Sequence, residues 1–271
     1  KEAAERKDTH GYQPYAGLPA LREAFAGWYN RYFGVKLDAK QEILPLIGSK
    51  EGIMHISMAF LNPGDEVLVS RLEHHSNIVP WQLLCEETGA VLKVVPMNQR
   101  GELELDSLKE MLTERVKFIA MVQISNALGT VNPVEEICSL AKSRGIPVLI
   151  DGAQAVPHQA VDVQAMGCDF YCFSGHKMYG PTGIGVLWGK YEHLQNMRPY
   201  QGGGEMIRSV SFNQTTFNVI PHKFEAGTPN IAGAIALGTA IDYLDGVGLE
   251  GIGAHEADLL RYGTEALVQI P

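Results

Sequence analysis

Short apolar runs alternate along this chain with amphipathic segments about a dozen residues long, and this alternation constrains the fold most strongly. Runs that stay apolar on both sides of the chain are typical of strands that are covered on both faces of a sheet. The alternation therefore predicts an α/β domain with a mixed, mostly parallel sheet flanked by helices. The expected strands lie at 66–70, 91–96, 116–125, 147–153, 169–175 and 183–189, and the expected helices near 49–61, 76–88, 104–113 and 133–143.

Bulk composition argues against several classes of protein. The 271 residues carry a formal net charge of −9, whereas nucleic-acid binding needs clustered Lys and Arg, so we expect no nucleic-acid partner. No apolar run approaches the roughly 20 residues of a membrane helix, and we expect no membrane association. Four cysteines are too few for a disulfide scaffold at this length, which indicates a reducing, cytoplasmic location.

Two of the cysteines, Cys168 and Cys172, are four residues apart, which raises the alternative of a metal-ligand pair. The segment 168–175 is expected to be a buried strand, in which residues four apart share a face but lie far apart. No further pair of Cys or His residues supplies the missing ligands. We therefore expect structural cysteines and no bound metal.

Polar and ionisable residues follow four of the apolar runs directly. These segments are EHHSN (73–77), SNALGT (125–130), DGAQ (151–154) and SGHK (174–177). The carboxyl ends of parallel strands meet at one edge of a sheet, where ligands of α/β proteins collect. One such segment could be a helix cap, but four that converge on one edge predict a binding or catalytic site.

Lys177 and Asp151 are the two residues of these segments that fit pyridoxal 5′-phosphate (PLP) as a cofactor. An amine beside apolar backbone is partly desolvated, which favours its neutral form and a Schiff base with an aldehyde. A carboxylate at the end of the preceding strand can pair with a protonated pyridine nitrogen. Taken alone, Lys177 also fits a solvated loop lysine and Asp151 a helix N-cap; together they favour the cofactor.

Residues 66–236 closely resemble the class V branch of the fold-type-I PLP enzymes, and within it the Suf-type (group II) cysteine desulfurases. The resemblance implies the large domain of a PLP-dependent transferase of fold type I, assembled as a homodimer that acts on L-cysteine. The motifs that carry it are EHHSNIVPWQ (73–82), QISNALGTVNPV (123–134), IDGAQAVPH (150–158), FSGHKMYGPTGIG (173–185), QGGGEMI (201–207) and FEAGTPN (224–230).

The resemblance implies catalytic and ring-binding roles for four residues. Lys177 is expected to form the Schiff base with PLP and to move protons. Asp151 is expected to hold the pyridinium, and Gln154 to hydrogen-bond the phenolic oxygen of the cofactor. His74 is expected to stack on the ring and to assist proton transfer.

Further residues are implied as contacts of the phosphate and of the substrate. Ser174 and His176 are expected to bind the phosphate, and Thr228 to reach it from the neighbouring subunit. Asn126 is expected near the substrate carboxylate and the phenolic oxygen.

The beginning of the chain differs from the rest. Its segments THGYQPYAGLPALREAFAGWYNRYFGV (9–35) and LIGSKEGIMHISMAFLNPGDEVLV (46–69) resemble class I aminotransferases. In that family, the tyrosine matching Tyr12 reaches the phosphate of the partner subunit. Backbone amides of the turn matching Gly48, Ser49 and Lys50 hold the phosphate at a helix N-terminus, where the helix dipole favours an anion.

We therefore predict an aminotransferase-like segment at 1–69 that joins a desulfurase-like segment at 70–271 within one continuous domain. Because the two families share the large-domain fold, a crossover inside the strand 66–70 would keep the sheet intact. A recombined or engineered chimera and a divergent natural protein are the two alternatives.

The desulfurase nucleophile belongs to an Arg-x-Gly-x-His-Cys-Ala segment of a C-terminal small domain, followed by an arginine that binds the substrate carboxylate. Neither has a counterpart up to Pro271. We therefore expect a protein of the cysteine desulfurase lineage, which turns L-cysteine into L-alanine and an enzyme-bound persulfide, with impaired turnover here. The alternatives are an aminotransferase-like activity, for which no carboxylate-binding arginine is evident, and a non-catalytic PLP-binding scaffold.

Overall fold

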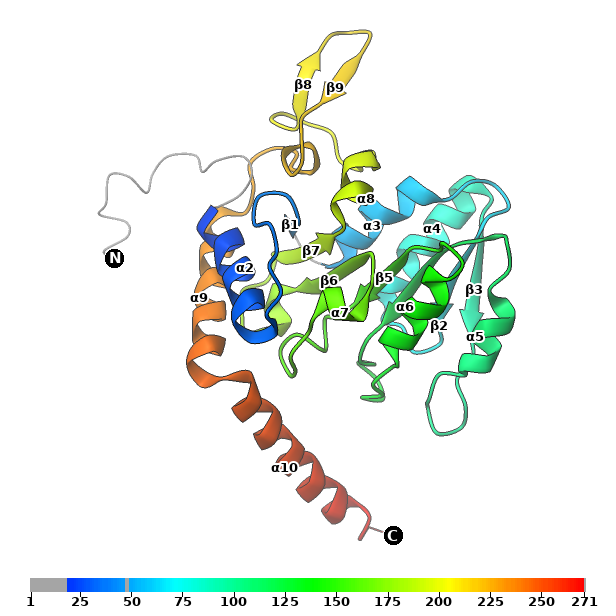
Figure 1. Ribbon diagram of the computed structural model, residues 1–271, viewed down its shortest axis with the longest axis vertical. Helices are drawn as coiled ribbons and strands as arrows, with labels where there is room; N and C mark the ends of the chain where they lie inside the picture. Colours follow the sequence, from blue (N-terminus) through cyan, green and yellow to red (C-terminus); the bar gives the residue numbers. More distant parts are fainter. Residues whose placement is uncertain (1–18, 47–48, 271) are drawn as a thin grey trace, which may run out of the picture.

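A computed structural model of the chain describes residues 19–46 and 49–270. In this part of the chain, seven strands form one sheet in the order β1-β7-β6-β5-β4-β2-β3 (Figure 1). The pairs from β6 to β3 are parallel, whereas β7 is antiparallel to both of its neighbours. The predicted mixed, mostly parallel sheet is confirmed. Its strands are β1 (Ile43–Leu46), β2 (Glu66–Ser70), β3 (Val91–Val95), β4 (Val116–Val122), β5 (Val148–Asp151), β6 (Phe170–Ser174) and β7 (Gly185–Gly189).

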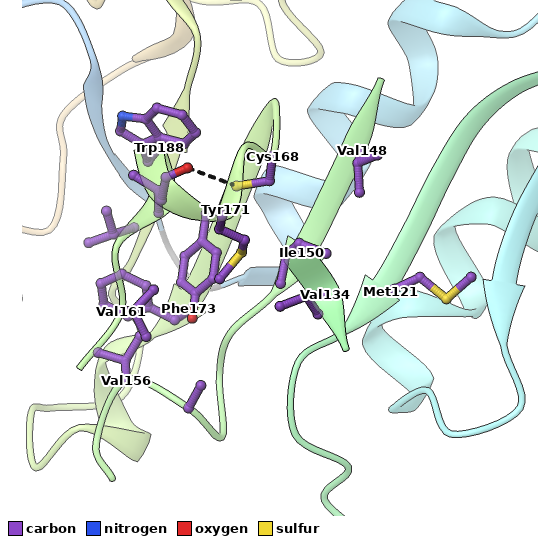
Figure 2. Close-up of a cluster of buried hydrophobic side chains, with 14 of the residues drawn as sticks. Met121, Val134, Val148, Ile150, Val156, Val161, Cys168, Tyr171, Phe173 and Trp188 are labelled. Carbon is purple, nitrogen blue, oxygen red and sulfur yellow. Dashed lines mark hydrogen bonds between the residues drawn. The ribbon is translucent and has the colours of Figure 1, made fainter. Parts of the chain in front are cut away.

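Helices bury both faces of this sheet, which explains why its central strands are apolar throughout. One face is covered by α3 (Ser49–Phe60) and α4 (Val79–Thr88). Five of the described helices cover the other face, which holds the larger core; Figure 2 shows part of this core around Tyr171 and Phe173 of β6. These five are α2 (Pro19–Phe33), α5 (Leu105–Met111), α6 (Val134–Lys142), α7 (Val163–Met166) and α9 (Ile231–Val247).

All six predicted strands and all four predicted helices form near their expected positions. Helix α4 ends where Gly89 adopts a φ of 77°, a left-handed conformation that glycine enters at little cost. The prediction missed further elements of the described chain, among them the short helices α7 and α8 (Tyr191–Asn196). The others include α2, β1, α9, α10 (Leu249–Leu267) and the hairpin of β8 (Ile207–Val210) and β9 (Thr215–Phe217).

Cys168 and Cys172 lie on opposite faces of the sheet, which corrects the expectation that they share one. Cys168 belongs to the larger core, where its thiol faces the Val163 carbonyl oxygen (Figure 2), and Cys172 belongs to the core under α3 and α4. Strand β6 begins only at Phe170, so the two-residue alternation does not extend back to Cys168.

The β8–β9 hairpin and helix α10 project from the body at opposite ends of the molecule (Figure 1). Helix α8 (Tyr191–Asn196) follows β7 and leads toward the hairpin. Among the described residues, no single helix is both long and apolar enough to cross a membrane. Helices α9 and α10, which meet at 74°, pass that test of length and composition only as a pair.

Candidate active site

The ends of β2, β5 and β6 bring three of the four predicted polar segments to one edge of the sheet, and the fourth segment follows β4 at the same edge. Asp151 pairs in register with Val122 of β4 and with Cys172 of β6. The Gln123 N–H donates to the Asp151 carbonyl oxygen at 2.9 Å, so the strand ends stay aligned beyond the last ladder pair. The aligned strand ends therefore hold the residues that follow them in fixed positions.

Asp151, the last residue of β5, places a carboxylate at this edge of the sheet. Its position in β5 puts the side chain on the same face as Leu149, under α3 and α4, and Asp151 is only 2% exposed. The Ala153 N–H donates to Asp151 Oδ1 at 3.0 Å. Burial raises the pKa of the Asp151 carboxyl, and the Ala153 N–H, Lys177 and His74 oppose that rise. A cation bound beside Asp151 would therefore be strongly favoured.

Lys177 ends the short 3₁₀ turn η3 (Gly175–Lys177) that follows β6. The turn is packed tightly, because a Cβ added to Gly175 would lie 2.9 Å from Ile184 Cγ2. The Gly175 N–H donates to the Ile184 carbonyl oxygen at 2.9 Å, which ties the turn to the entry of β7. Lys177 is half-buried, and its charge acts on both Asp151 and His74.

His74 follows β2 and caps the next turn, η2 (His75–Asn77). The Ser76 N–H donates to His74 Nδ1 at 3.1 Å, so Nδ1 is the unprotonated nitrogen and Nε2 carries the hydrogen. Burial and then Lys177 lower the pKa of His74, while Asp151 raises it and His75 lowers it. The lowered pKa therefore favours the neutral ring of His74, and the Ser76 N–H fixes its tautomer.

Ser49 and Ser174 form a small polar cluster beside Lys177. Ser49 opens α3, and its backbone N–H donates to Ser174 Oγ at 3.2 Å. The two hydroxyl oxygens are 3.1 Å apart, and both residues are buried. Two hydroxyl groups at the amino end of a 12-residue helix form a donor set suited to a phosphate.

Glu73 is a buried ionisable residue of the site that the sequence interpretation left without a role. Its carboxylate accepts hydrogen bonds from Ser70, Asn77 and the Val122 N–H, and the residue is 8% exposed. Burial raises the pKa of Glu73 to about 7 against these hydrogen bonds, and Asp151 raises it as well. The spacing of Ser70 and Glu73 resembles a capping box and could have drawn attention to the pair.

The remaining predicted residues lie further out or cannot be placed. Gln154 is half-buried, whereas His176 and Asn126 are exposed. Thr228 is exposed too and lines a separate cavity of about 390 Å³ together with Gln201. Of the other residues predicted to bind the phosphate, Tyr12 and Gly48 lie outside the described residues, and so does the side chain of Lys50.

All four thiols of the chain are held in their neutral form by their surroundings. Burial raises the pKa of Cys85, that of Cys138 to about 12, and those of Cys168 and Cys172 well above the usual range. Cys85 is partly exposed, and the other three are buried. A thiolate nucleophile requires the opposite shift, so none of the four is set up for sulfur chemistry.

These groups match the chemically distinct parts of PLP one by one. A half-buried amine suits its aldehyde, a buried carboxylate suits its ring cation, and the serine cluster at α3 suits its phosphate. A side chain at position 175 would clash with Ile184 and displace the turn that carries Lys177, so glycine keeps this turn in place. Fold and site together define the large domain of a PLP-dependent transferase of fold type I.

The chain belongs to the aminotransferase class V family, whose family model matches residues 14–271. A cysteine desulfurase from Serratia proteamaculans is 49% identical over 259 residues, which are 94% of this chain and 62% of that protein. A probable cysteine desulfurase from Xylella fastidiosa is 54% identical over 210 residues, covering 78% of this chain and 50% of that protein.

A solved structure gives the same picture. The cysteine desulfurase CsdA from Escherichia coli superposes with a TM-score of 0.87 at 39% identity, covering 93% of this chain and 63% of CsdA. The chain thus spans about half to under two thirds of the length of these relatives. The family and the desulfurase relatives support PLP as the cofactor.

Proposed function

We propose that this chain is the cofactor-binding part of a Suf-type cysteine desulfurase, which takes sulfur from L-cysteine and leaves L-alanine. The observation that carries the proposal is the grouping of Lys177, Asp151 and His74 at the carboxyl edge of the sheet. The cysteine desulfurases among the relatives give the substrate and the reaction.

In this proposal, PLP bound at Lys177 supplies an electron-withdrawing ring that stabilises negative charge on the substrate carbon atoms. Asp151 keeps the ring nitrogen protonated, because a buried carboxylate gains most from a cation beside it. Lys177 Nζ moves the proton at the substrate Cα, and His74 stacks on the ring with Nε2–H available as a donor.

The outer groups have binding roles. Ser49 and Ser174 hold the phosphate with His176, and Gln154 donates to the phenolic oxygen. Asn126 lies near the substrate carboxylate.

The sulfur acceptor is a thiol other than the four described above, because all four are neutral and three are buried. In the balanced reaction, the C–S bond of L-cysteine breaks and an S–S bond forms on the acceptor. The proton of the acceptor thiol ends on the methyl group of L-alanine. The 271 residues alone are therefore expected to turn over L-cysteine poorly.

The proposed assembly is a homodimer in which Thr228 reaches the phosphate site of the partner. Its exposed position is consistent with a contact between subunits. Sedimentation of the PLP-bound protein checks this proposal: a dimer that loosens PLP when Thr228→Ala is introduced supports it, and a monomer with unchanged PLP affinity rules it out.

The chimeric origin of the chain, with a junction near residue 69, is also a proposal. It predicts that a segment matching residues 1–69 can be exchanged between natural desulfurases and aminotransferases without loss of the sheet. The reason is that β1 belongs to the same sheet as β5 and β6, and α3 packs on that sheet. A soluble, PLP-binding exchange protein is the expected result.

The function is tested by measuring L-alanine and sulfide formed from L-cysteine by the PLP-bound protein with a reductant. With an added persulfide-accepting thiol compound, we expect alanine formation that Lys177→Ala abolishes and that survives replacement of all four cysteines by serine. Loss of activity in the four-serine protein, with its fold intact, would make one of these thiols the acceptor. Absence of alanine under every condition would remove the desulfurase assignment.

A further inference from the structure

We propose that Glu73 is a positioning residue of the cofactor site, which fixes the turn carrying His74 to two strand ends and supplies a second buried negative charge beside Asp151. The inference rests on the proposed function, because it concerns how this chain holds PLP.

The carboxylate of Glu73 collects hydrogen bonds from three elements. Ser70, at the end of β2, donates from Oγ at 2.5 Å and from its N–H at 3.4 Å. The Val122 N–H, at the end of β4, donates at 2.8 Å, and Asn77 Nδ2, in η2, donates at 2.7 Å. Trp81 Nε1 in turn donates to Asn77 Oδ1 at 3.0 Å. The residue next to His74 is thus tied to two strands and to the start of α4.

Only a carboxylate satisfies this arrangement. Four donors converge on the two oxygens of Glu73, and an amide at this position would direct its own N–H groups at one of them. Rotating the Asn77 amide cannot relieve that conflict, because its oxygen already accepts from Trp81. The four donors therefore favour the ionised form, but burial outweighs them and raises the pKa of Glu73 to about 7, so the carboxyl group is charged mainly above that pH.

Only strand β4 lies between Glu73 and Asp151, so the charge of Glu73 acts on the cofactor site. Glu73 binds the Val122 N–H, and Val122 is the register partner of Asp151. Cys172, the partner of Asp151 on its other side, is affected by both carboxylates, which raise its thiol pKa after burial. The groups facing Glu73 are therefore one anion, one neutral thiol and hydrogen-bond donors, so its negative charge is not cancelled locally.

Two neighbouring buried carboxylates repel each other, and a cation beside Asp151 relieves that repulsion. A protonated ring nitrogen supplies such a cation. Glu73 should therefore increase both the affinity for PLP and the proton affinity of the bound chromophore. It does so without touching the cofactor, through charge and through the position of the His74 turn.

The test compares Glu73→Gln with Asn77→Ala in the PLP-bound protein. The first variant removes the ionisable carboxyl group, and the second removes one of its donors and keeps the carboxyl group. The readouts are the pH midpoint of the visible absorbance of bound PLP and the dissociation constant for PLP. We expect Glu73→Gln to lower the midpoint by about one pH unit, equivalent to a tenfold loss of proton affinity, and Asn77→Ala to leave it within a few tenths of a unit.

If Glu73→Gln does not fold, Glu73→Asp carries the test. It keeps the charge but is one methylene too short to meet all four donors, so it should preserve the midpoint and weaken PLP binding at least about threefold. Equal pH midpoints in Glu73→Gln and Asn77→Ala, or PLP binding by Glu73→Asp as tight as in the parent, would overturn the role of Glu73. Either result would leave the proposed function standing. A parent protein that never develops the visible band with PLP would overturn the proposed function as well.

Discussion

At the residue scale, burial of Asp151 lowers the stability of the cofactor-free protein and favours binding of the cofactor. Its pKa in the folded protein is raised by burial, so the stability it contributes is fully present only below its unfolded pKa and is lost as pH rises. Above its raised pKa, the ionised carboxylate of Asp151 therefore destabilises the protein until a cation pairs with it.

We expect Asp151→Asn to raise the melting temperature of the PLP-free protein at pH 7, by roughly 2–4 °C for each kcal/mol relieved. The same variant should lose the protonated ring signal of bound PLP, because an amide cannot hold the cation. Thermal unfolding with and without PLP checks both effects. A variant less stable than the parent without PLP, with an unchanged PLP spectrum, would contradict this account of Asp151.

Gly152, like Gly175, is a residue at which the site tolerates no side chain. A Cβ at position 152 would lie 1.8 Å from the hydroxyl oxygen of Tyr171. Tyr171 is fully buried, and its hydroxyl group donates to Gln123 Oε1 at 2.6 Å. Gly152→Ala should therefore cost about 3 kcal/mol or more in the free energy of unfolding.

The matched control is Gly27→Ala in α2, where a Cβ meets nothing within 4 Å and the helix should gain about 0.5–1 kcal/mol. Urea unfolding gives both values. A Gly152→Ala protein as stable as the parent would mean that Tyr171 is not held where the structure places it.

Lys177 and Asp151 could be singled out from the sequence because each directly follows an apolar run, and parallel strands bring such positions together. The buried position and hydrogen bonds of Glu73 could not be predicted from the sequence in the same way. One of its donors, the Val122 N–H, lies 49 residues away, and its burial depends on the pairing of β2 with β4.

At the scale of elements, a buried ion pair joins α2 to the segment that carries Thr228. Arg22 Nη2 lies 2.5 Å from Glu225 Oε1, and both side chains are less than a tenth exposed. Burial raises the pKa of Glu225 to about 7 although Arg22 lowers it. Glu225 therefore contributes stability that is complete below its unfolded pKa and is lost as pH rises through about 7.

Arg22→Met removes the compensating charge, so its cost should grow with pH and reach about 3–5 kcal/mol near pH 8. Arg31→Met is the control, because Arg31 pairs with Asp245 at the surface and should contribute less than about 1 kcal/mol. Denaturant unfolding at pH 5.5 and pH 8 measures both. An Arg22→Met penalty that does not increase with pH would contradict the charged state assigned to the pair.

The elements that could be predicted are those whose pattern reflects their burial. β2 is buried at all five positions, and its apolar run coincides with the strand. β1 contains Pro45, which breaks a strand pattern and is tolerated because β1 is an edge strand. Helix α9 is apolar on most sides and rich in small residues, so it lacks the polar face that reveals an amphipathic helix.

At the scale of the whole molecule, the fold class followed from the alternation of strands and helices, and the cofactor from the ends of the strands. Among the described lysines, Lys177 and Lys223 differ in how well they suit attachment of the aldehyde. Lys177 lies beside Asp151, whereas Lys223 is buried and its pKa is lowered by desolvation. Lys223 Nζ already donates to the carbonyl oxygens of Gln195 and Met197, at 2.7 and 2.8 Å, which leaves it unsuited to attack an aldehyde.

The most direct measurement locates the covalent attachment of PLP. The protein is saturated with PLP, reduced with borohydride and digested, and the modified peptide is identified by mass spectrometry. We expect the label on Lys177, and a Lys177→Ala protein without label and without visible absorbance. A label on Lys223 or another lysine, or a Lys177→Ala protein that keeps the band, would contradict the assignment of the site.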